Sequence, residues 1–287
     1  MIYCKECFDL EDGIMIRSLW TAASGMKSQQ TNVDTISNNL ANASTTGYKK
    51  ETAEFKSLLY QTLQDETTTA DGRVKPLSAQ VGLGVRNSSI ISRFTQGPFT
   101  TTDNPLDIGI AGDGFFSIGM PDGTVAYTRN GCFSVAMVNN EDYYTIATSD
   151  GYPVLDINGQ PIQISKQYDA SKLAISEDGT ISYYDAKGNQ TPINITFGIY
   201  QFTNPSGLEK TSDSILRESV NSGAPILEAN NNNIQKSALK QGKLESSNVQ
   251  TVDEMVNLII AQRTYEMNSK IVTASDEMLQ QANNLRA

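Results

Sequence analysis

The stretch that decides the fold is SSNVQTVDEMVNLIIAQRTYEMNSKIVTASDEMLQQANNLR, residues 246–286. Its apolar residues recur every three or four positions, the spacing of one face of an α-helix. At about 1.5 Å per residue such a helix would run roughly 50–60 Å, well beyond an average globular helix, and it needs a partner along its whole length. The predicted stripe consists of Val249, Val252, Val256, Ile260, Thr264, Met267, Ile271, Ala274, Met278, Gln281 and Leu285.

The composition of this stripe favours a crowded multi-helix assembly over a two-stranded zipper. A seven-residue repeat runs from Thr264 to Leu285, but the steps from Val252 to Thr264 are all fours. Successive steps of four relax left-handed supercoiling, so we expect a nearly straight helix there. Isolated helix pairs usually carry Leu, Ile or Val at most seam positions, whereas this stripe includes Thr264, Ala274 and Gln281.

A second helical pattern near the N-terminus supplies a candidate partner. Its apolar residues recur every seven positions, and Trp20 and Ile36 widen the apolar face. Small residues at 22–25 permit close approach of another helix, although Gly25 costs roughly 1 kcal/mol against Ala in a helix interior. The two terminal segments are therefore predicted to form one coiled-coil-like helical module, although the middle of the chain separates them in the sequence. Two ordinary amphipathic core helices are the alternative. The repeat positions are Leu19, Met26, Val33 and Leu40.

Local signals mark the inner ends of both predicted helices. The N-terminal helix should end near residues 42–47, where Asn, Ser, Thr and Gly cluster and Gly47 can take the left-handed conformation. Asp253 and Glu254 lie in the opening turns of the C-terminal helix, where negative charge meets the helix dipole favourably. The candidate N-caps of that helix are Ser246, Ser247 and Asn248.

From Val81 the sequence changes to short β-rich runs separated by turn dipeptides. The clearest predicted hairpin joins runs 124–129 and 132–135 through Asn130-Gly131, a pair that suits a type I′ turn. Many short strands at this spacing predict an antiparallel barrel-like or sandwich-like domain. Residues 206–243 return to the composition of a loop. The fold class is therefore α+β, with long terminal helices and a central all-β domain. Further turn pairs are Asp113-Gly114, Asp122-Gly123, Asp150-Gly151, Asn158-Gly159 and Asp178-Gly179.

Composition excludes several classes of function. The chain has 287 residues, a formal net charge of −10 and a sequence pI near 4.6. This balance argues against a nucleic-acid or anionic-membrane surface, because both need clustered positive charge. No apolar run approaches the roughly 20 residues of a membrane span, so we expect no membrane insertion. The first fourteen residues also lack the basic and apolar regions of a cleaved signal peptide.

The residues needed for common catalytic and metal sites are missing or out of context. There is no His in the chain, which removes the commonest general base and metal ligand. Cys4 and Cys7 form a C-x-x-C pair without a second pair to complete a zinc site. We therefore predict no enzyme activity, no cofactor and no metal. A carboxylate-pair hydrolase would draw on the acidic residues of the β region, but Asp113 and Asp122 each precede Gly and are better explained as turn formers. The candidate carboxylates are Asp103, Asp107, Asp113 and Asp122.

Motifs at both ends of the chain resemble those of bacterial flagellar basal-body rod and hook proteins. The N-terminal motifs are MIRSLWTAASGM at 15–26, ISNNLAN at 36–42 and TGYK at 46–49; the C-terminal ones are LESSNV at 244–249, EMVN at 254–257 and AQRTYE at 261–266. RSLW at 17–20 and QVGLGV at 80–85 are similar to the distal-rod type of this family. The resemblance covers nearly the whole chain from Met15 onward.

The resemblance implies a structural subunit of the distal rod, which self-assembles into a rigid hollow helical shaft that transmits torque to the hook. It also implies export to the periplasm through the flagellum's own type III apparatus. The implied partners are further copies of the chain, the proximal rod protein, the hook protein and the outer bushing-ring proteins. A proximal rod or hook subunit is the alternative within the family. A secreted binding module built on the β domain is the alternative from another class.

The predicted domain organisation has four parts. Residues 1–14 precede the usual start of the family and are expected to be a disordered leader or a start-site artefact. Residues 15–47 with 246–287 form the helical assembly domain, 48–80 an arm that is either helical or extended, and 81–245 the β domain. The expected subunit-interface residues are Leu19, Met26, Val33, Leu40, Val252, Val256, Ile260, Met267, Ile271, Met278 and Leu285.

Overall fold

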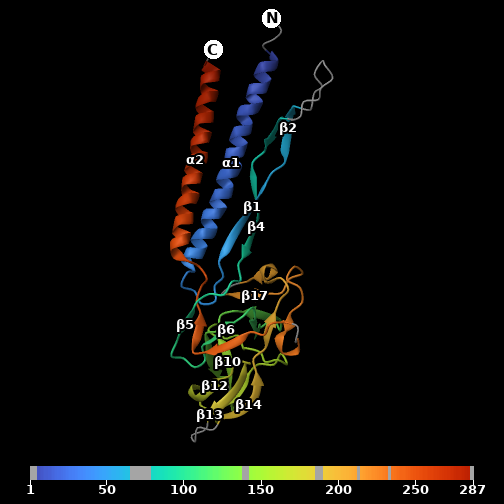
Figure 1. The fold of residues 1–287 in the computed structure, drawn as a ribbon, viewed down its shortest axis with the longest axis vertical. Coiled ribbons are helices and arrows are strands. Elements are labelled where there is room, and N and C mark those ends of the chain that lie inside the picture. Colours follow the sequence, from blue (N-terminus) through green and yellow to red (C-terminus); the bar gives the residue numbers. More distant parts are fainter. Residues whose placement is uncertain are drawn as a thin grey trace. The chain divides into compact units, whose positions relative to one another are not determined.

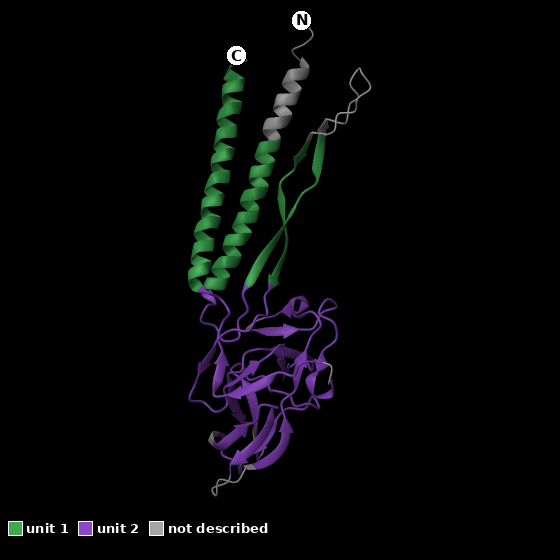
Figure 2. Cartoon of the chain, viewed as in Figure 1, with its two compact units in different colours: residues 1–40, 51–91, 251–287 green, residues 41–50, 92–250 purple. Residues whose placement is uncertain are grey.

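The computed structural model describes residues 5–64, 79–137, 142–184, 190–211, 214–231 and 234–284. These residues form two compact units (Figure 2). The helical unit consists of residues 1–40, 51–91 and 251–287, and the β unit consists of residues 41–50 and 92–250. Residues 65–78 of the expected arm and the interface residue Leu285 lie outside the described residues. The four-part division expected from the sequence stays a prediction.

Two long helices dominate the helical unit (Figure 1). Helix α1 spans Lys5–Ala41 and helix α2 spans Thr251–Asn284, and they run antiparallel to each other. The expected end of the N-terminal helix is confirmed, since α1 ends at Ala41 and Gly47 has a φ of 70°. Because α1 begins at Lys5, the backbone of residues 5–14 is helical. The status of residues 1–14 as a leader stays a prediction.

The start of α2 differs from the expectation. The helix begins at Thr251, so Ser246, Ser247 and Asn248 do not cap it. Their polar groups are used elsewhere: the Ser246 backbone N–H donates to the Pro98 carbonyl, and the Asn248 Nδ2 donates to the Arg93 carbonyl at 2.9 Å. These bonds hold the segment against the loop of residues 93–98, which precedes strand β5 (Phe99–Thr101). Asp253 and Glu254 do lie in the first turn of α2, as expected.

The arm after α1 is extended rather than helical. Strand β1 (Glu51–Ser57) pairs with β4 (Val85–Ser92), and β2 (Tyr60–Gln64) pairs with β3 (Ala79–Gly82) in antiparallel register. The result is a long two-stranded ribbon in the helical unit. The sequence left helix and extended chain open here, because its charged and apolar residues fit either.

The β unit is built from antiparallel sheets, which confirms the α+β class. Its largest sheet has the order β16-β17-β8-β7-β15-β18. Two three-stranded sheets and two strand pairs complete the described part of the unit. Closure into a barrel or sandwich stays a prediction. The strands of the largest sheet are β16 (Glu209–Lys210), β17 (Ile215–Arg217), β8 (Val125–Thr128), β7 (Phe115–Gly119), β15 (Ile199–Gln201) and β18 (Ile226–Leu227).

The smaller sheets are formed by strands that come before, between and after the strands of the largest sheet in the sequence. Their orders are β11-β10-β9, β12-β13-β14, β19-β6 and β20-β5. The expected loop at 206–243 thus contains β16 to β19, because short segments without strong alternation still pair with existing strand edges. The bounds are β5 (Phe99–Thr101), β6 (Ile108–Ala111), β9 (Phe133–Met137), β10 (Tyr143–Thr148), β11 (Gln163–Ser165), β12 (Leu173–Ile175), β13 (Thr180–Tyr184), β14 (Gln190–Thr196), β19 (Ala238–Gln241) and β20 (Lys243–Glu245).

The hairpin expected at Asn130-Gly131 is wrong. Strand β8 pairs with β7 and β17, whereas β9 pairs with β10. Gly131 is needed for a close approach instead of a turn, because a Cβ there would overlap the carbonyl oxygen of Ile108. The hairpin that does form joins β7 to β8 through Asp122-Gly123, where Gly123 has a φ of 75°.

The apolar core of the β unit lies between its sheets. Phe116, Phe133 and Phe197 are fully or almost fully buried, and the Phe116 and Phe133 rings meet edge to face with centroids 5.0 Å apart. Isoleucine side chains from several sheets surround them, among them Ile108, Ile146 and Ile181. These large rings and branched side chains remove enough apolar surface from water to make this unit stable.

Candidate assembly surface

Helices α1 and α2 meet along a seam of small and polar residues. A Cβ on Gly25 would lie 2.9 Å from the Nδ2 of Asn268, so the helix backbones approach closely there. The hydroxyls of Ser18 and Ser275 are 3.2 Å apart, and the Asn39 amide donates to the Glu254 carboxylate at 3.3 Å. From Ser18 to Gly25 on α1, and from Asn268 to Ser275 on α2, the step is seven residues, as a repeating helix seam requires.

The apolar stripe predicted on α2 lies away from this seam. Six of its apolar members on α2 are roughly half to three-quarters exposed, from 46% at Ile271 to 71% at Val252, whereas Val249, just before the helix, is buried and Thr264 is half-buried. The seam instead takes the buried Ala261 and Ser275. The exposed members are Val252, Val256, Ile260, Met267, Ile271 and Met278, and Met255 and Ile259 extend this surface. We call these eight residues the α2 stripe.

The interface residues predicted on α1 are neither fully buried nor fully exposed. Leu19, Met26, Val33 and Leu40 are all half-buried. The two residues expected to widen this apolar face differ in exposure: Ile36 is buried, whereas Trp20 is 71% exposed. The structure therefore leaves a row of exposed apolar side chains on α2 and, among the α1 residues whose side chains it describes, one large exposed apolar side chain, Trp20.

Sequence reasoning missed the seam because it followed apolar residues. The signal was present as a seven-residue spacing of small or polar residues, with Glu254, Ala261, Asn268 and Ser275 on α2. Such residues permit close approach of two backbones, and they occupy the contact that a thin apolar stripe was expected to make. Apolar periodicity alone does not reveal a seam of this composition.

A shallow pocket opens between the two helices beside the seam. It has a volume of about 390 Å³ and is lined by Gln30 and Val33 of α1 and by Gln262, Tyr265 and Glu266 of α2. Its walls are thus an aliphatic side chain and a tyrosine ring, with amide and carboxylate groups around them. We call it the interhelical pocket.

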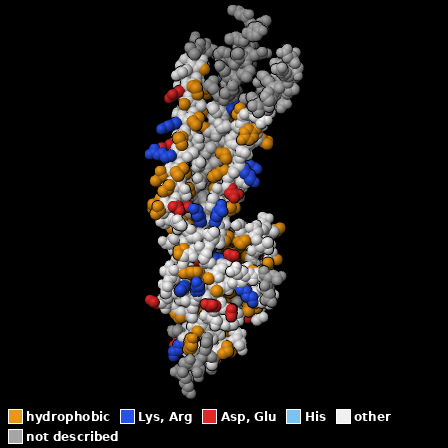
Figure 3. Space-filling view, in the orientation of Figure 1, with side chains coloured by type: hydrophobic (Ala, Val, Ile, Leu, Met, Phe, Trp, Pro, Cys, Tyr) orange, Lys and Arg blue, Asp and Glu red, His pale blue; other side chains and the backbone are white. Residues whose placement is uncertain are grey.

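The ribbon contributes further exposed apolar side chains to the helical unit. Leu59 and Tyr60 are 83% and 63% exposed. Hydrophobic side chains are scattered over this unit in the space-filling view (Figure 3). Ser24 of α1 accepts a hydrogen bond from the Val85 backbone N–H at 3.3 Å, which ties the ribbon to the helix. Gly84, at the same place, has a φ of 108°.

In the β unit, a buried carboxylate joins segments that are far apart in the sequence. Glu245 is 1% exposed and pairs with the Lys49 Nζ at 2.6 Å and the Arg129 Nη1 at 3.2 Å. The Gly97 N–H donates to the same carboxylate, and Lys49 also donates to the Thr95 carbonyl. Burial lowers the pKa of Lys49, helped by the positive charge of Arg129 and opposed by Glu245.

This charged cluster connects two of the motifs noted in the sequence. Lys49 ends TGYK at 46–49 and Glu245 lies in LESSNV at 244–249, so the segments that follow α1 and precede α2 meet here. The Gly47 N–H also donates to the Glu245 carbonyl at 2.8 Å. Sequence analysis did not single out this pair, because a buried ion pair looks like two ordinary surface charges until the fold is known.

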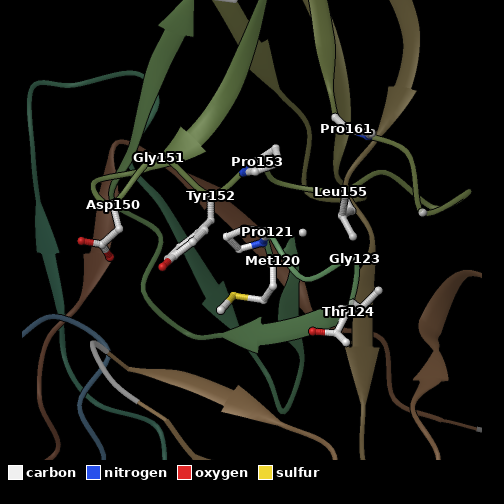
Figure 4. Close-up of a pocket in the computed structure, with 13 residues that line it drawn as sticks. Met120, Pro121, Gly123, Thr124, Asp150, Gly151, Tyr152, Pro153, Leu155 and Pro161 are labelled. Carbon is white, nitrogen blue, oxygen red and sulfur yellow. The ribbon is translucent and has the colours of Figure 1, made fainter.

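A second pocket lies in the β unit, beside the β7–β8 turn (Figure 4). It has a volume of about 550 Å³ and apolar walls that include Met120, Tyr152 and Pro153. Among the described residues that line it, Asp150 is the one charged side chain, and its carboxylate points outward. An apolar hollow with this lining offers no nucleophile and base pair.

Two further findings bear on the classes of function. Within the residues that the structure describes, no group of three or more Cys, Asp or Glu side chains could hold a metal ion. The described helices include none with the length and apolar character needed to cross a membrane.

Comparison with known proteins defines the class. Residues 19–49 match the family "Flagella basal body rod protein", residues 109–183 the D1 domain of the flagellar hook proteins FlgE/F/G, and residues 240–285 the C-terminal part of the flagellar basal-body rod proteins FlgEFG. The three matched regions thus cover much of α1, part of the β unit and α2, in that order along the chain.

Full-length relatives agree with this class. The flagellar basal-body rod protein FlgG of Borreliella burgdorferi is 43% identical over 95% of this chain and 99% of its own length. FlgG of Bacillus subtilis is 40% identical over 95% of this chain and 100% of its own. The hook-basal body complex protein FlhP of Bacillus subtilis is 33% identical over the same share.

The chain therefore belongs to the family of flagellar basal-body rod proteins. Within that family it is FlgG-like, and it is a structural subunit of the rod of the flagellar basal body.

Proposed function

We propose that this subunit polymerises with itself into the distal part of the rod, as a straight hollow helical shaft that transmits torque to the hook. The α2 stripe, together with the half-buried Leu19, Met26, Val33 and Leu40, forms the contact between copies in a coiled-coil-like packing of several helices. The observation that carries this proposal is the exposure of the α2 stripe while the opposite side of α2 is occupied by α1.

The energetics favour burial of this stripe. Fully burying a Val, Ile or Met side chain stabilises by about 1.5–3 kcal/mol, so burying the α2 stripe in a contact between copies is favourable. A contact between different faces of two copies does not close on itself, and repeating it generates a helical polymer. A rod built this way gains rigidity because each helix is packed on several sides.

The remaining features of the proposal follow from membership of the family. The rod would join a proximal rod protein at one end and the hook protein at the other, and it would turn inside the outer bushing rings. The subunit would reach the periplasm through the flagellar type III apparatus. It would act without enzyme activity, cofactor, metal, nucleic acid or insertion into a membrane.

The test is the substitution Ile271→Asp in the full chain. Ile271 is 46% exposed in the single chain, so the variant should fold, but assembly would place an unpaired charge in an apolar contact at a cost of several kcal/mol. Sedimentation and electron microscopy should show rods for the unchanged chain and monomers for the variant. Val220→Asp is the matched control, because Val220 is fully exposed on the β unit. Normal rods from folded Ile271→Asp subunits would contradict the proposal.

A further inference from the structure

A large exposed aromatic side chain on α1 lies outside the α2 stripe. Trp20 is the one tryptophan of the chain, and 71% of its surface is exposed on α1. Tryptophan is enriched among the residues that carry most of the binding energy of protein interfaces, because it buries a large area at a small entropic cost. An indole that stands out from a helix surface in this way needs a concave partner.

The interhelical pocket has the chemistry to receive an indole. Val33 and the ring of Tyr265 provide apolar and aromatic walls, against which a second ring can pack edge to face. Gln30, Gln262 and Glu266 place side-chain oxygens around these walls, and one of them can accept the indole N–H. The volume of about 390 Å³ lies within the range of pockets that hold small organic groups.

The charges around the two features are complementary. Arg17 and Lys27 lie three and seven residues from Trp20, on the same side of α1. Glu266 lines the pocket. Asp34 lies four residues after Gln30 and therefore on the same face of α1. Opposite charges around a projection and its socket steer the encounter and fix its register. Arg263 pairs with Glu266 at 3.0 Å within the subunit, but both side chains are largely exposed and such pairs are weak.

The spacing of the two features excludes a contact within one copy. Trp20 and Val33 are thirteen residues apart on one helix, which corresponds to about 20 Å along its axis and about 140° around it. Each copy therefore has a free indole on one side and a free pocket on another. A contact of this kind is heterologous, so it passes from copy to copy without closing on a pair.

We propose that Trp20 of one subunit inserts into the interhelical pocket of a second copy of this chain, displaced by about 20 Å along the helix axis. This contact rests on the proposed function, since it requires the self-assembled rod. This contact would fix the axial register between neighbouring subunits, which contact through the α2 stripe alone would leave undefined.

The first arm of the test uses the natural fluorescence of Trp20. In the monomer its emission should be that of a water-exposed indole and be readily quenched by acrylamide. In assembled rods the emission should shift to shorter wavelength and resist quenching. Tyr265→Ala, which removes one wall of the pocket, should abolish this protection, whereas Tyr143→Ala on the exposed surface of the β unit should leave it unchanged. Trp20→Ala should raise the lowest protein concentration that yields rods by roughly thirtyfold, the factor expected for a central interface residue.

The second arm is a disulfide cross-link between copies. In a chain with Cys4, Cys7 and Cys132 changed to Ser, Arg17→Cys and Gln30→Cys place thiols beside Trp20 and in the pocket, at positions that the proposed displacement brings level with each other. These positions are thirteen residues apart on one helix, about 20 Å, too far for a bridge within one copy. Oxidised rods should give a ladder of covalent multimers, and the same rods with Arg17→Cys and Asn38→Cys should not, because Asn38 lies about 12 Å further along the axis.

The outcomes separate this contact from the proposed function. Rods with a shielded indole and a ladder support the contact. Rods whose indole stays quenchable and which give no ladder overturn the contact and leave the proposed function standing. A folded full chain that forms no rods under any condition overturns both.

Discussion

Glu245 connects three distant segments of the β unit through two buried ion pairs. Its carboxylate, 1% exposed, accepts from Lys49 and Arg129, whose side chains are 4% and 2% exposed. Removing one member of a buried charge network leaves the others desolvated and unpaired, which costs far more than the loss of a surface pair. The segment that follows α1 and the segment that precedes α2 are thus joined through one buried carboxylate.

Glu245→Gln should destabilise the β unit strongly. The substitution keeps the size of the side chain but leaves two buried cations without the carboxylate that pairs with both, at a cost of about 3–5 kcal/mol. Urea unfolding, followed by the near-ultraviolet dichroism of the tyrosines, would measure the loss. Glu266→Gln is the control, because it breaks an exposed pair and should change stability by about 1 kcal/mol or less. Equal effects of both variants would show that the buried network is not needed.

Ionisation of Tyr144 should lower the stability of the β unit at alkaline pH. Burial raises the pKa of Tyr144 to about 12, with smaller contributions from Asp169 and Tyr183, and its hydroxyl donates to the Tyr168 carbonyl at 2.9 Å. In the unfolded chain the phenol ionises near pH 10. The unfolded state therefore loses its proton first, and the stability contributed by neutral Tyr144 is lost as the pH rises from about 10 to about 12.

The test is Tyr144→Phe, which removes the ionisable group and should make the loss of stability above pH 10 shallower. The lost hydrogen bond should lower stability at pH 7 by about 1 kcal/mol. Urea unfolding at a series of pH values gives both quantities. Tyr143→Phe, at an exposed neighbour, should follow the unchanged chain at every pH. An identical alkaline loss in Tyr144→Phe would refute the role of this phenol.

At the scale of elements, the ribbon and α1 meet at a glycine. Gly84 has a φ of 108°, which L-residues rarely adopt, and a Cβ there would overlap the hydroxyl of Ser24. The Leu58 N–H donates to the Gly84 carbonyl at 2.9 Å, so the conformation of Gly84 also joins the two strands of the ribbon. The path of this ribbon against α1 therefore depends on the absence of one side chain.

Gly84→Ala should loosen the ribbon without unfolding the β unit. The backbone strain and the overlap with Ser24 together should cost more than the roughly 1 kcal/mol typical of glycine replacement. Hydrogen exchange at the Leu58 amide should accelerate at least severalfold, because local opening becomes easier. Gly123→Ala is the control: it has a φ of 75° but open space around it, and it lies in the β unit. Unchanged protection of Leu58 in Gly84→Ala would argue against this contact.

At the scale of the whole molecule, the two units differ in what holds them together. The β unit has large apolar clusters around Phe116 and Phe115, whereas the helical unit has a seam of small and polar residues and exposes the α2 stripe. Since apolar burial is the main source of folding free energy, the helical unit of a single chain should be the less stable one.

Monomers should therefore unfold in two steps. In urea, the far-ultraviolet dichroism of the helices should fall before the near-ultraviolet dichroism of the tyrosines in the β unit. Assembly should raise the first midpoint by mass action, because neighbouring subunits bind only the folded helices. Coincident transitions of both signals in the monomer would indicate one cooperative unit and contradict this expectation.

The sequence by itself determined the elements and their types. Steps of three and four predicted the C-terminal helix, and a seven-residue repeat predicted the N-terminal one. Gly47 marked the region just beyond the end of α1, and Asp-Gly pairs marked several turns correctly, among them Gly123, Gly151 and Gly179 with positive φ. These signals are local, since periodicity and turn conformation depend on a few neighbouring residues. Motifs at both ends of the chain were enough to indicate the family.

Only the tertiary structure decided which surfaces meet. It paired Gly25 with Asn268 and left Val252 and Trp20 exposed, and it used Gly131 for a close approach where the sequence predicted a hairpin turn. It also buried Glu245 between two cations. The physical reason is that a helix face or a charge has no fixed environment of its own. Its partner comes from a distant part of the chain, and packing shape and desolvation select that partner only after the chain has folded.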